Sequence, residues 1–117
     1  MRIDRLTSRL QVAISDAQSI ALGKDHQFIE PVHLIQVLID QNGSVSALLR
    51  QLSVDVKQFR TELGRLVDEL PTVEGADGDV HMSNDLGRML NIADKLAQKK
   101  GDQFISSEMV LLAATGD

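Results

Sequence analysis

The tripeptide Gln-Phe-Ile occurs twice in this chain, at residues 27–29 and again at 103–105. Each copy follows a segment with helical spacing of apolar residues and precedes a second apolar run. The shift that superposes the two copies also places Leu10 on Leu86, Ala17 on Ala93 and Ala21 on Ala97. Self-similarity at a fixed period is typical of repeat architectures. We therefore expect two related helical units.

The repeat predicts how the 117 residues are divided. Unit one covers about 1–70, an acidic linker covers 71–82, and unit two covers 83–117. A second unit as long as the first would extend to about residue 146, so we expect unit two to be incomplete.

Apolar spacing and capping residues predict an all-α fold with no strand. The predicted helices run from Leu6 to Gly23, Pro31 to Gln41, Val45 to Leu52, Val56 to Leu70, Ser83 to Gly101 and Ser107 to Ala114. Gly23 is expected to end the first helix in a left-handed conformation, and Pro71 to end the fourth. Asp55 and Ser83 are predicted N-caps.

Composition narrows the class of protein. Hydrophobic residues make up 43% and charged residues 25%, which is ordinary for a globular domain. The chain has no cysteine, which excludes disulfides and zinc–thiolate sites. A net charge of −5 disfavours binding to nucleic acid or anionic lipid, and Lys99-Lys100 is the only adjacent basic pair. No apolar run reaches the roughly 18 residues of a membrane span.

Motifs for catalysis are missing. The sequence has no phosphate-binding loop, no H-E-x-x-H and no G-x-S-x-G, so a hydrolase or metal-dependent enzyme is disfavoured. His33 and Glu30 could present two metal ligands on one helix face, but a surface histidine beside a cap carboxylate is the favoured interpretation. An acidic group could bind a cation weakly: Asp68, Glu69, Glu74, Asp77 and Asp79. A solvated linker is favoured, because calcium loops need a stricter ligand spacing.

The second long helix has a wider apolar stripe than the first. Ile92 stands where the first helix has Asp16, and a helical wheel places Ile92 and Leu96 beside Met89 but off the core face. Extra apolar width on an exposed helix is typical of an interaction surface. The alternative is that another helix of unit one, or a helix missing from unit two, covers it. Met89 and Met109 could line such a groove, since thioethers adapt to varied partners.

Several segments together resemble the N-terminal domains of the Clp AAA+ chaperones. They are residues 1–7, 17–23, 27–34, 78–80, 94–102 and 104–108. The resemblance covers the whole chain. It is closer to the ClpB disaggregases than to ClpA or ClpC, because residues 1–7 and 78–80 are similar to ClpB.

The resemblance implies a two-repeat, all-α Clp N domain without catalytic activity, and without cofactor or metal of its own. It implies a cytoplasmic parent protein that forms a hexameric, ATP-driven ring, works with the DnaK system and threads aggregated polypeptide. ATP and Mg would be bound by AAA+ modules absent from this chain. The implied role is capture of unfolded or aggregated polypeptide in an apolar groove, without nucleic acid or membrane partners. The alternative is an adaptor-docking or regulatory N domain, as in the ClpA and ClpC branches.

The resemblance also implies a set of substrate-binding residues. The polar candidates are Thr7, Asp102 and Glu108, and the apolar candidates are Leu90, Ile92, Leu96 and Met109. Each polar candidate also has a structural interpretation, as a helix-entry residue, a turn residue and a carboxylate at the positive end of a helix. Leu90 also fits a core position. Because unit two lacks the last two helices of unit one, we expect an exposed apolar face near Leu111 and Leu112.

Overall fold

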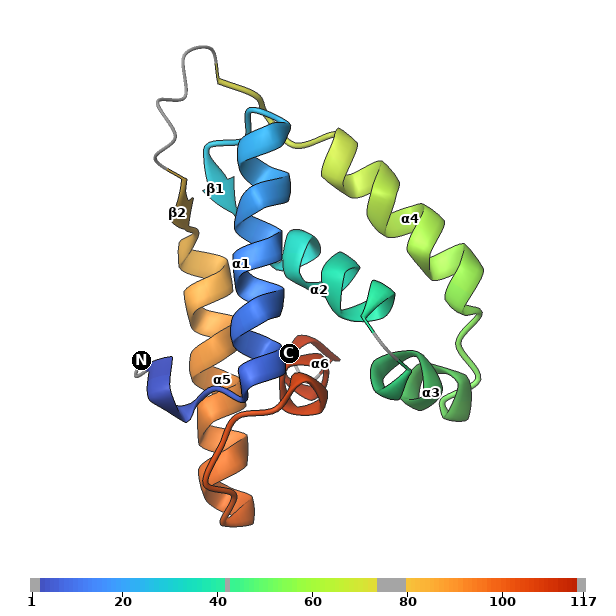
Figure 1. Cartoon of the computed structure of the whole chain (residues 1–117). Helices are drawn as coiled ribbons and strands as arrows, with labels where there is room; N and C mark the ends of the chain where they lie inside the picture. The colour runs from blue at the N-terminus through green and yellow to red at the C-terminus, as the bar shows by residue number, and fades with distance from the viewer. Residues whose placement is uncertain (1–2, 42, 74–79, 116–117) are drawn as a thin grey trace.

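The chain, seen here as a computed structural model that describes residues 3–41, 43–73 and 80–115, is mostly helical, as the sequence predicts (Figure 1). The elements are η1 (Ile3–Arg5), α1 (Ser8–Gly23), β1 (Phe28–Ile29), α2 (Pro31–Asp40), α3 (Ser44–Gln51), α4 (Val56–Asp68), β2 (His81–Met82), α5 (Asn84–Lys100) and α6 (Ser107–Thr115).

One hydrophobic core joins both units. The helix α2 packs against α1 and α4, and α6 packs against α5 and α3. The largest fully buried side chains come from both halves of the chain and include Leu10, Leu34, Leu38, Leu86, Leu90 and Ile105. Neither half therefore buries its apolar stripe alone.

The two long helices begin with the same kind of cap, at positions that the repeat makes equivalent. The hydroxyl of Thr7 accepts a hydrogen bond from the Leu10 backbone N–H at 3.2 Å. The hydroxyl of Ser83 accepts one from the Leu86 N–H at 3.0 Å. Each cap occupies a backbone N–H that would otherwise be left without a partner at the helix start.

Both cap residues also bond across the molecule to a Gln-Phe-Ile segment. Thr7 donates its backbone N–H to the carbonyl of Ile105, and Ser83 donates to the carbonyl of Ile29, each at 3.0 Å. The loop after each long helix is thus tied to the start of the other. The contacts at the two helix starts are equivalent under the shift that relates the two Gln-Phe-Ile copies.

Two short parallel strands accompany these bonds, so the prediction that the chain contains no strand is wrong in this detail. In the pairing of β1 with β2, Phe28 lies opposite His81 and Ile29 opposite Met82. Leu6 and Ile105 form a single parallel bridge at the other helix start. A two-residue strand is too short to show the alternation by which strands are found in a sequence.

Two helices do not end in the way that the sequence predicts. The helix α1 does end at Gly23, but the positive φ, of 60°, lies at Asp25, a residue type that tolerates the left-handed region. The helix α4 ends at Asp68, before Pro71. Gly101 follows α5 with a φ of 77°, a left-handed conformation that glycine adopts more readily than other residues do.

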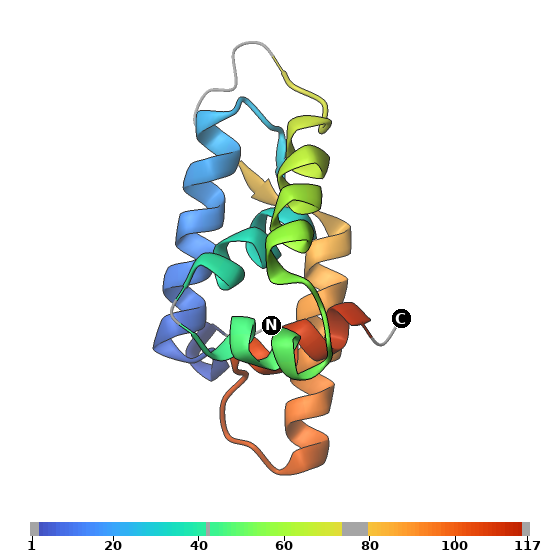
Figure 2. The same cartoon turned by 90° about the vertical axis from the view of Figure 1, so that its right-hand side faces the viewer.

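The predicted exposed face at Leu111 and Leu112 is only half correct. Leu111 is buried, with 3% exposure, whereas Leu112 is 43% exposed. The helix α3, which belongs to unit one, packs against α6 (Figure 2). Part of the cover for α6 therefore comes from the other unit, which the sequence pattern does not reveal.

The burial of Leu111 can be tested against its neighbour. We expect Leu111→Ala to lower the free energy of unfolding by about 2–5 kcal/mol, because it leaves a cavity between packed helices. Leu112→Ala is the matched control and should change it by less than about 1 kcal/mol. Urea denaturation followed by circular dichroism measures both. Equal effects of the two substitutions would contradict the burial of Leu111.

The equivalent caps can be tested together. We expect Thr7→Ala and Ser83→Ala each to cost about 1 kcal/mol of unfolding free energy, since each leaves a helix-start N–H without its partner. Thr61→Ala is the control, because the Thr61 hydroxyl bonds to the Lys57 carbonyl inside α4, where alanine is a good helix former. Chemical denaturation compares the three. A control as damaging as the cap variants would show that the caps are not what stabilises these helix starts.

Candidate functional site

The helix α5 has exposed edges on both sides of its buried stripe. Leu90 is fully buried and Met89 nearly so, whereas Ile92 and Leu96 are half-buried. On the wheel, Ile92 and Leu96 lie toward Met89 and away from Leu90. This distribution separates the apolar candidates into two neighbourhoods.

A groove lies on the Ile92 side, between α2, α5 and α6, and encloses about 330 Å³. Its apolar lining consists of Pro31, Ile35, Met89, Ile92, Ala113 and Ala114. Asp85 and Arg88 stand at its edge and form an exposed ion pair with an N–O distance of 3.3 Å. We call this the α2–α5–α6 groove. Apolar walls with a few polar groups at the edge are typical of binding sites.

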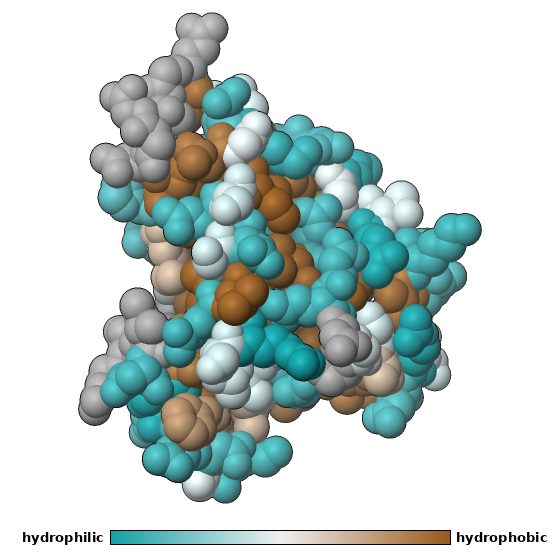
Figure 3. Space-filling model, in the orientation of Figure 1, coloured by the Kyte–Doolittle hydropathy of each residue, from teal (hydrophilic) through white to brown (hydrophobic). Residues whose placement is uncertain are grey.

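A second groove, of about 450 Å³, lies on the Leu90 side. We call it the α1–α5 groove. Leu6, Ile14, Met82 and Leu90 supply its apolar lining, and Gln11, Ser15 and Gln18 supply polar groups. The sequence analysis did not find it, because its residues come from three separate segments. In Figure 3 the face over α1 shows apolar patches divided by polar side chains, not one continuous apolar surface.

The three polar candidates lie at helix ends. Thr7 caps α1 and bonds to Ile105, in the loop before α6. Asp102 is exposed just beyond α5, and its N–H donates to the Ala97 carbonyl at 2.8 Å. Glu108 is half-buried in the first turn of α6. The three residues thus occupy the helix-entry, turn and first-turn positions that their structural interpretations predict.

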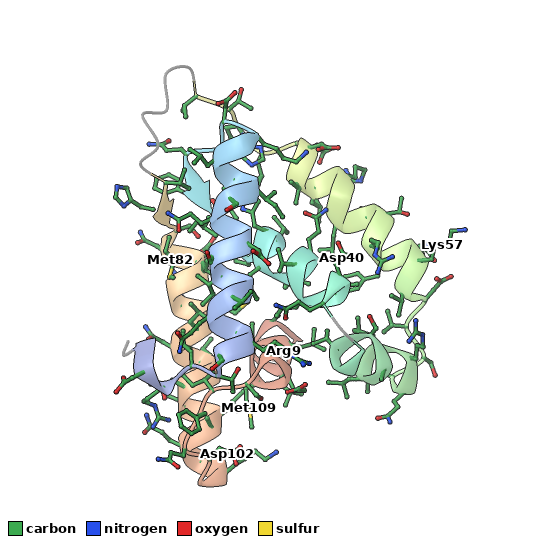
Figure 4. The ribbon with its side chains drawn as sticks, in the orientation of Figure 1. Arg9, Asp40, Lys57, Met82, Asp102 and Met109 are labelled. Atoms are coloured by element: carbon green, nitrogen blue, oxygen red, sulfur yellow. The ribbon has the colours of Figure 1, made fainter. Side chains whose placement is uncertain are left out.

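Met109 differs from its predicted place on an open groove wall. The side chain is buried, with 4% exposure. Figure 4 shows Met109 near the start of α6, with Asp102 at the lower end of α5 and Met82 toward its other end. The Met109 side chain therefore belongs to the hydrophobic core and does not form an open groove wall.

An ion pair that the sequence analysis missed holds the first residues of the chain on α5. The Arg5 guanidinium approaches the same Asp94 oxygen through Nε at 3.0 Å and through Nη2 at 2.9 Å. Both side chains are largely shielded from water, which reduces the screening of their attraction by solvent. The pair helps fix Leu6 and Thr7 against the second unit.

His33 is buried in the core, so the interpretation as a surface histidine is wrong, and so is the alternative of a ligand beside Glu30. Its Nδ1 accepts a hydrogen bond from the Glu30 backbone N–H, and its Nε2 lies 2.8 Å from Nδ1 of His26, which is also buried. Burial, His26 and Lys24 together lower the pKa of His33 to about 4. Residues 3–41, 43–73 and 80–115 contain no group of three or more side chains that could hold a metal ion.

The acidic linker is only partly described. Of the predicted acidic group, Asp68 forms an ion pair with Lys24 at 3.2 Å. Glu74, Asp77 and Asp79 lie outside the described residues. No helix in the described ranges combines the length and the apolar composition needed to cross a membrane.

A family of known domains matches almost the whole chain. Residues 5–117 match the Clp repeat N-terminal domain family. Among curated relatives, the chaperone protein ClpB of Vibrio cholerae is 58% identical over 118 aligned residues, which cover 100% of this chain and 14% of the relative. ClpB of Pseudomonas putida is 61% identical, with 97% and 14% covered. The chain thus spans about one seventh of the length of these relatives.

Solved structures agree on the fold. The N-terminal domain of Hsp104 from Candida albicans superposes with a TM-score of 0.84 at 19% identity, covering 92% of this chain and 71% of that one. The N-terminal domain of the ClpV1 ATPase from Escherichia coli gives 0.89 at 24% identity, covering 97% and 69%. The chain therefore belongs to the Clp repeat N-terminal domain family, as a non-catalytic module whose sequence matches the N-terminal region of ClpB chaperones.

Proposed function

We propose that this chain is the client-binding module of an ATP-dependent disaggregase, and that it captures unfolded or aggregated polypeptide at the α5 edge formed by Ile92 and Leu96. The observation that carries the proposal is the position of these two side chains. They are half-buried on a core helix, and Ile92 lines the α2–α5–α6 groove. Such partial exposure leaves apolar area that a flexible client can cover.

Chemistry at the groove suits a flexible, apolar ligand. Its lining is aliphatic apart from the thioether of Met89, which can repack around different side chains. The paired charges of Asp85 and Arg88 at its edge neutralise each other, so the rim does not select strongly for a charged client. Ordering an unfolded segment costs free energy, so capture should be weak for one domain and stronger for several on one ring.

The remaining candidates support this edge in different ways. Met109 is buried in the core, and Leu90 lines the α1–α5 groove on the other side of α5. We propose that Asp102 and Glu108 orient bound polypeptide with their carboxylates. The Thr7 hydroxyl already accepts one bond as an N-cap, so its contribution to binding would use its second lone pair or its proton.

The wider role of the parent protein is part of the proposal. By similarity to ClpB, we infer a cytoplasmic hexamer that binds ATP and Mg in modules outside this chain and cooperates with the DnaK system. The relatives found by sequence are ClpB chaperones, which favours client capture over the adaptor docking of ClpA and ClpC.

Substitution at the α5 edge tests the proposal. We expect Leu96→Asp to weaken binding of an unfolded, fluorescently labelled protein about tenfold, because one well-placed apolar side chain contributes on the order of 1.5 kcal/mol. Fluorescence anisotropy measures the affinity, and circular dichroism shows whether the helices persist. Leu66→Asp is the matched control, because Leu66 is a 37% exposed leucine on α4, away from both grooves.

Ile14→Asp separates the two grooves, because Ile14 lines only the α1–α5 groove. Binding that resists Leu96→Asp and Ile92→Asp but is lost in Ile14→Asp would move the site to that groove and contradict the proposed edge. Binding unaffected by all three would contradict client capture by either groove.

A further inference from the structure

The buried histidine pair sits where several segments of the chain meet. The backbone N–H of His26 donates to the Ala21 carbonyl at 2.9 Å, which ends the α1 segment. His26 also forms an antiparallel bridge with Thr72, and the Val73 N–H donates to the Asp25 carbonyl at 2.8 Å. A short way beyond Asp25 comes Ile29, which pairs with β2. The turn thus joins α1, β1, α2 and the segment after α4.

Hydrogen-bond geometry assigns the proton positions of both imidazoles. The Glu30 N–H donates to Nδ1 of His33 at 2.8 Å, so this nitrogen carries no proton. A neutral His33 must then carry its proton on Nε2, which donates to Nδ1 of His26 at 2.8 Å. His26 in turn carries its own proton on Nε2. One direction of donation therefore runs from Glu30 through His33 to His26.

Neither ring can take a second proton and keep this arrangement. Protonation of His33 at Nδ1 would place two N–H groups against each other at the start of α2. Protonation of His26 at Nδ1 would oppose the Nε2–H of His33. Both rings are nearly inaccessible to water, with 3% exposure for His26 and 0% for His33, so solvent cannot compensate.

Nearby carboxylates do not offset the cost of burying an imidazolium, although Asp68 and Asp25 act to raise the pKa of His26. The charged groups facing the pair are Lys24 and Asp25 in the turn, Asp68 on α4 and Glu30 at the N-cap of α2. Lys24 pairs with Asp68 at 3.2 Å, which offsets much of the attraction that Asp68 would offer. Burial is the main cause that lowers the pKa of both histidines, followed by Lys24 for His26 and by His26 for His33.

We propose that His26 and His33 form an acid-sensitive latch, which holds the turn between α1 and α2 closed while both rings are neutral and opens it when either ring is protonated. The latch does not depend on the function proposed above. Opening would free the Glu30 N–H and the segments bridged at His26, and Pro31, which follows Glu30, lines the α2–α5–α6 groove.

The sign of the pH dependence follows from the lowered pKa values. Between the ordinary histidine pKa of 6.5 and the value of about 4 for His33, the open form binds more protons than the closed form. The latch is therefore stable above about pH 6.5 and weakens as the pH falls toward 4. For one released imidazole, the opening constant should rise about twentyfold from pH 7 to pH 5.

Amide hydrogen exchange on the 117-residue chain tests the latch. After correction for intrinsic rates, the Glu30 and His26 amides should lose about twentyfold protection from pH 7 to pH 5, while the Leu90 amide in α5 loses much less. His33→Gln should weaken this dependence, because glutamine does not titrate and only His26 remains to take up a proton. His81→Gln is the matched control at an exposed histidine and should leave it unchanged. A Glu30 amide whose protection is independent of pH, or falls in parallel with that of Leu90, would overturn the latch.

Imidazole ¹⁵N shifts of the unmodified chain give a test that does not rely on any variant folding. At pH 7 both His26 and His33 should show a protonated Nε2 and a bare Nδ1. Near pH 6.5 both rings should still be neutral. Protonation of His26 or His33 near pH 6.5 with the Glu30 amide still protected would also overturn the proposal.

Discussion

The fold depends on two backbone hydrogen bonds that cross between its halves, from Thr7 to Ile105 and from Ser83 to Ile29. Each bond ties the start of one long helix to the loop that follows the other. This explains why Gln-Phe-Ile recurs. Ile29 and Ile105 are buried, with 5% and 0% exposure, whereas Phe28 and Phe104 are 40% and 49% exposed. The isoleucine provides both the buried side chain and the accepting carbonyl, while the phenylalanine faces outward.

Because the two long helices begin with matching caps and backbone hydrogen bonds, the differences between the units are informative. Where α1 carries Asp16, which is exposed, α5 carries the half-buried Ile92. The hydrogen bonds at the helix starts are the same in both cases, so they do not require this difference. Ile92 packs partly against the core, and it also makes the exposed edge of the helix apolar. An apolar side chain at such an edge is a reason to look for a binding surface there, and the groove beside Ile92 gives that surface a shape.

Local signals in the sequence were enough to predict the helices and the half-buried edge at Ile92 and Leu96, because helical periodicity and caps act over a few residues. Contacts between distant segments were not predictable in this way. Examples are the packing of α3 on α6 and the α1–α5 groove, whose lining runs from Leu6 to Leu90. The burial of His33 was missed for the same reason, since its partner His26 lies in a polar turn. The roles of the seven candidate binding residues remain predictions.

The histidine pair and the candidate groove meet in the first turn of α2. His33 accepts from Glu30, the residue at the N-cap, and Pro31 directly afterwards forms part of the groove wall. A fully satisfied buried polar network specifies one arrangement, because any shift leaves a donor or acceptor without a partner. The hydrogen bond from Glu30 to His33 therefore helps to position Pro31, the next residue. An apolar contact alone would tolerate small rotations of α2, so the hydrogen-bonded pair accounts for a groove wall with one defined position.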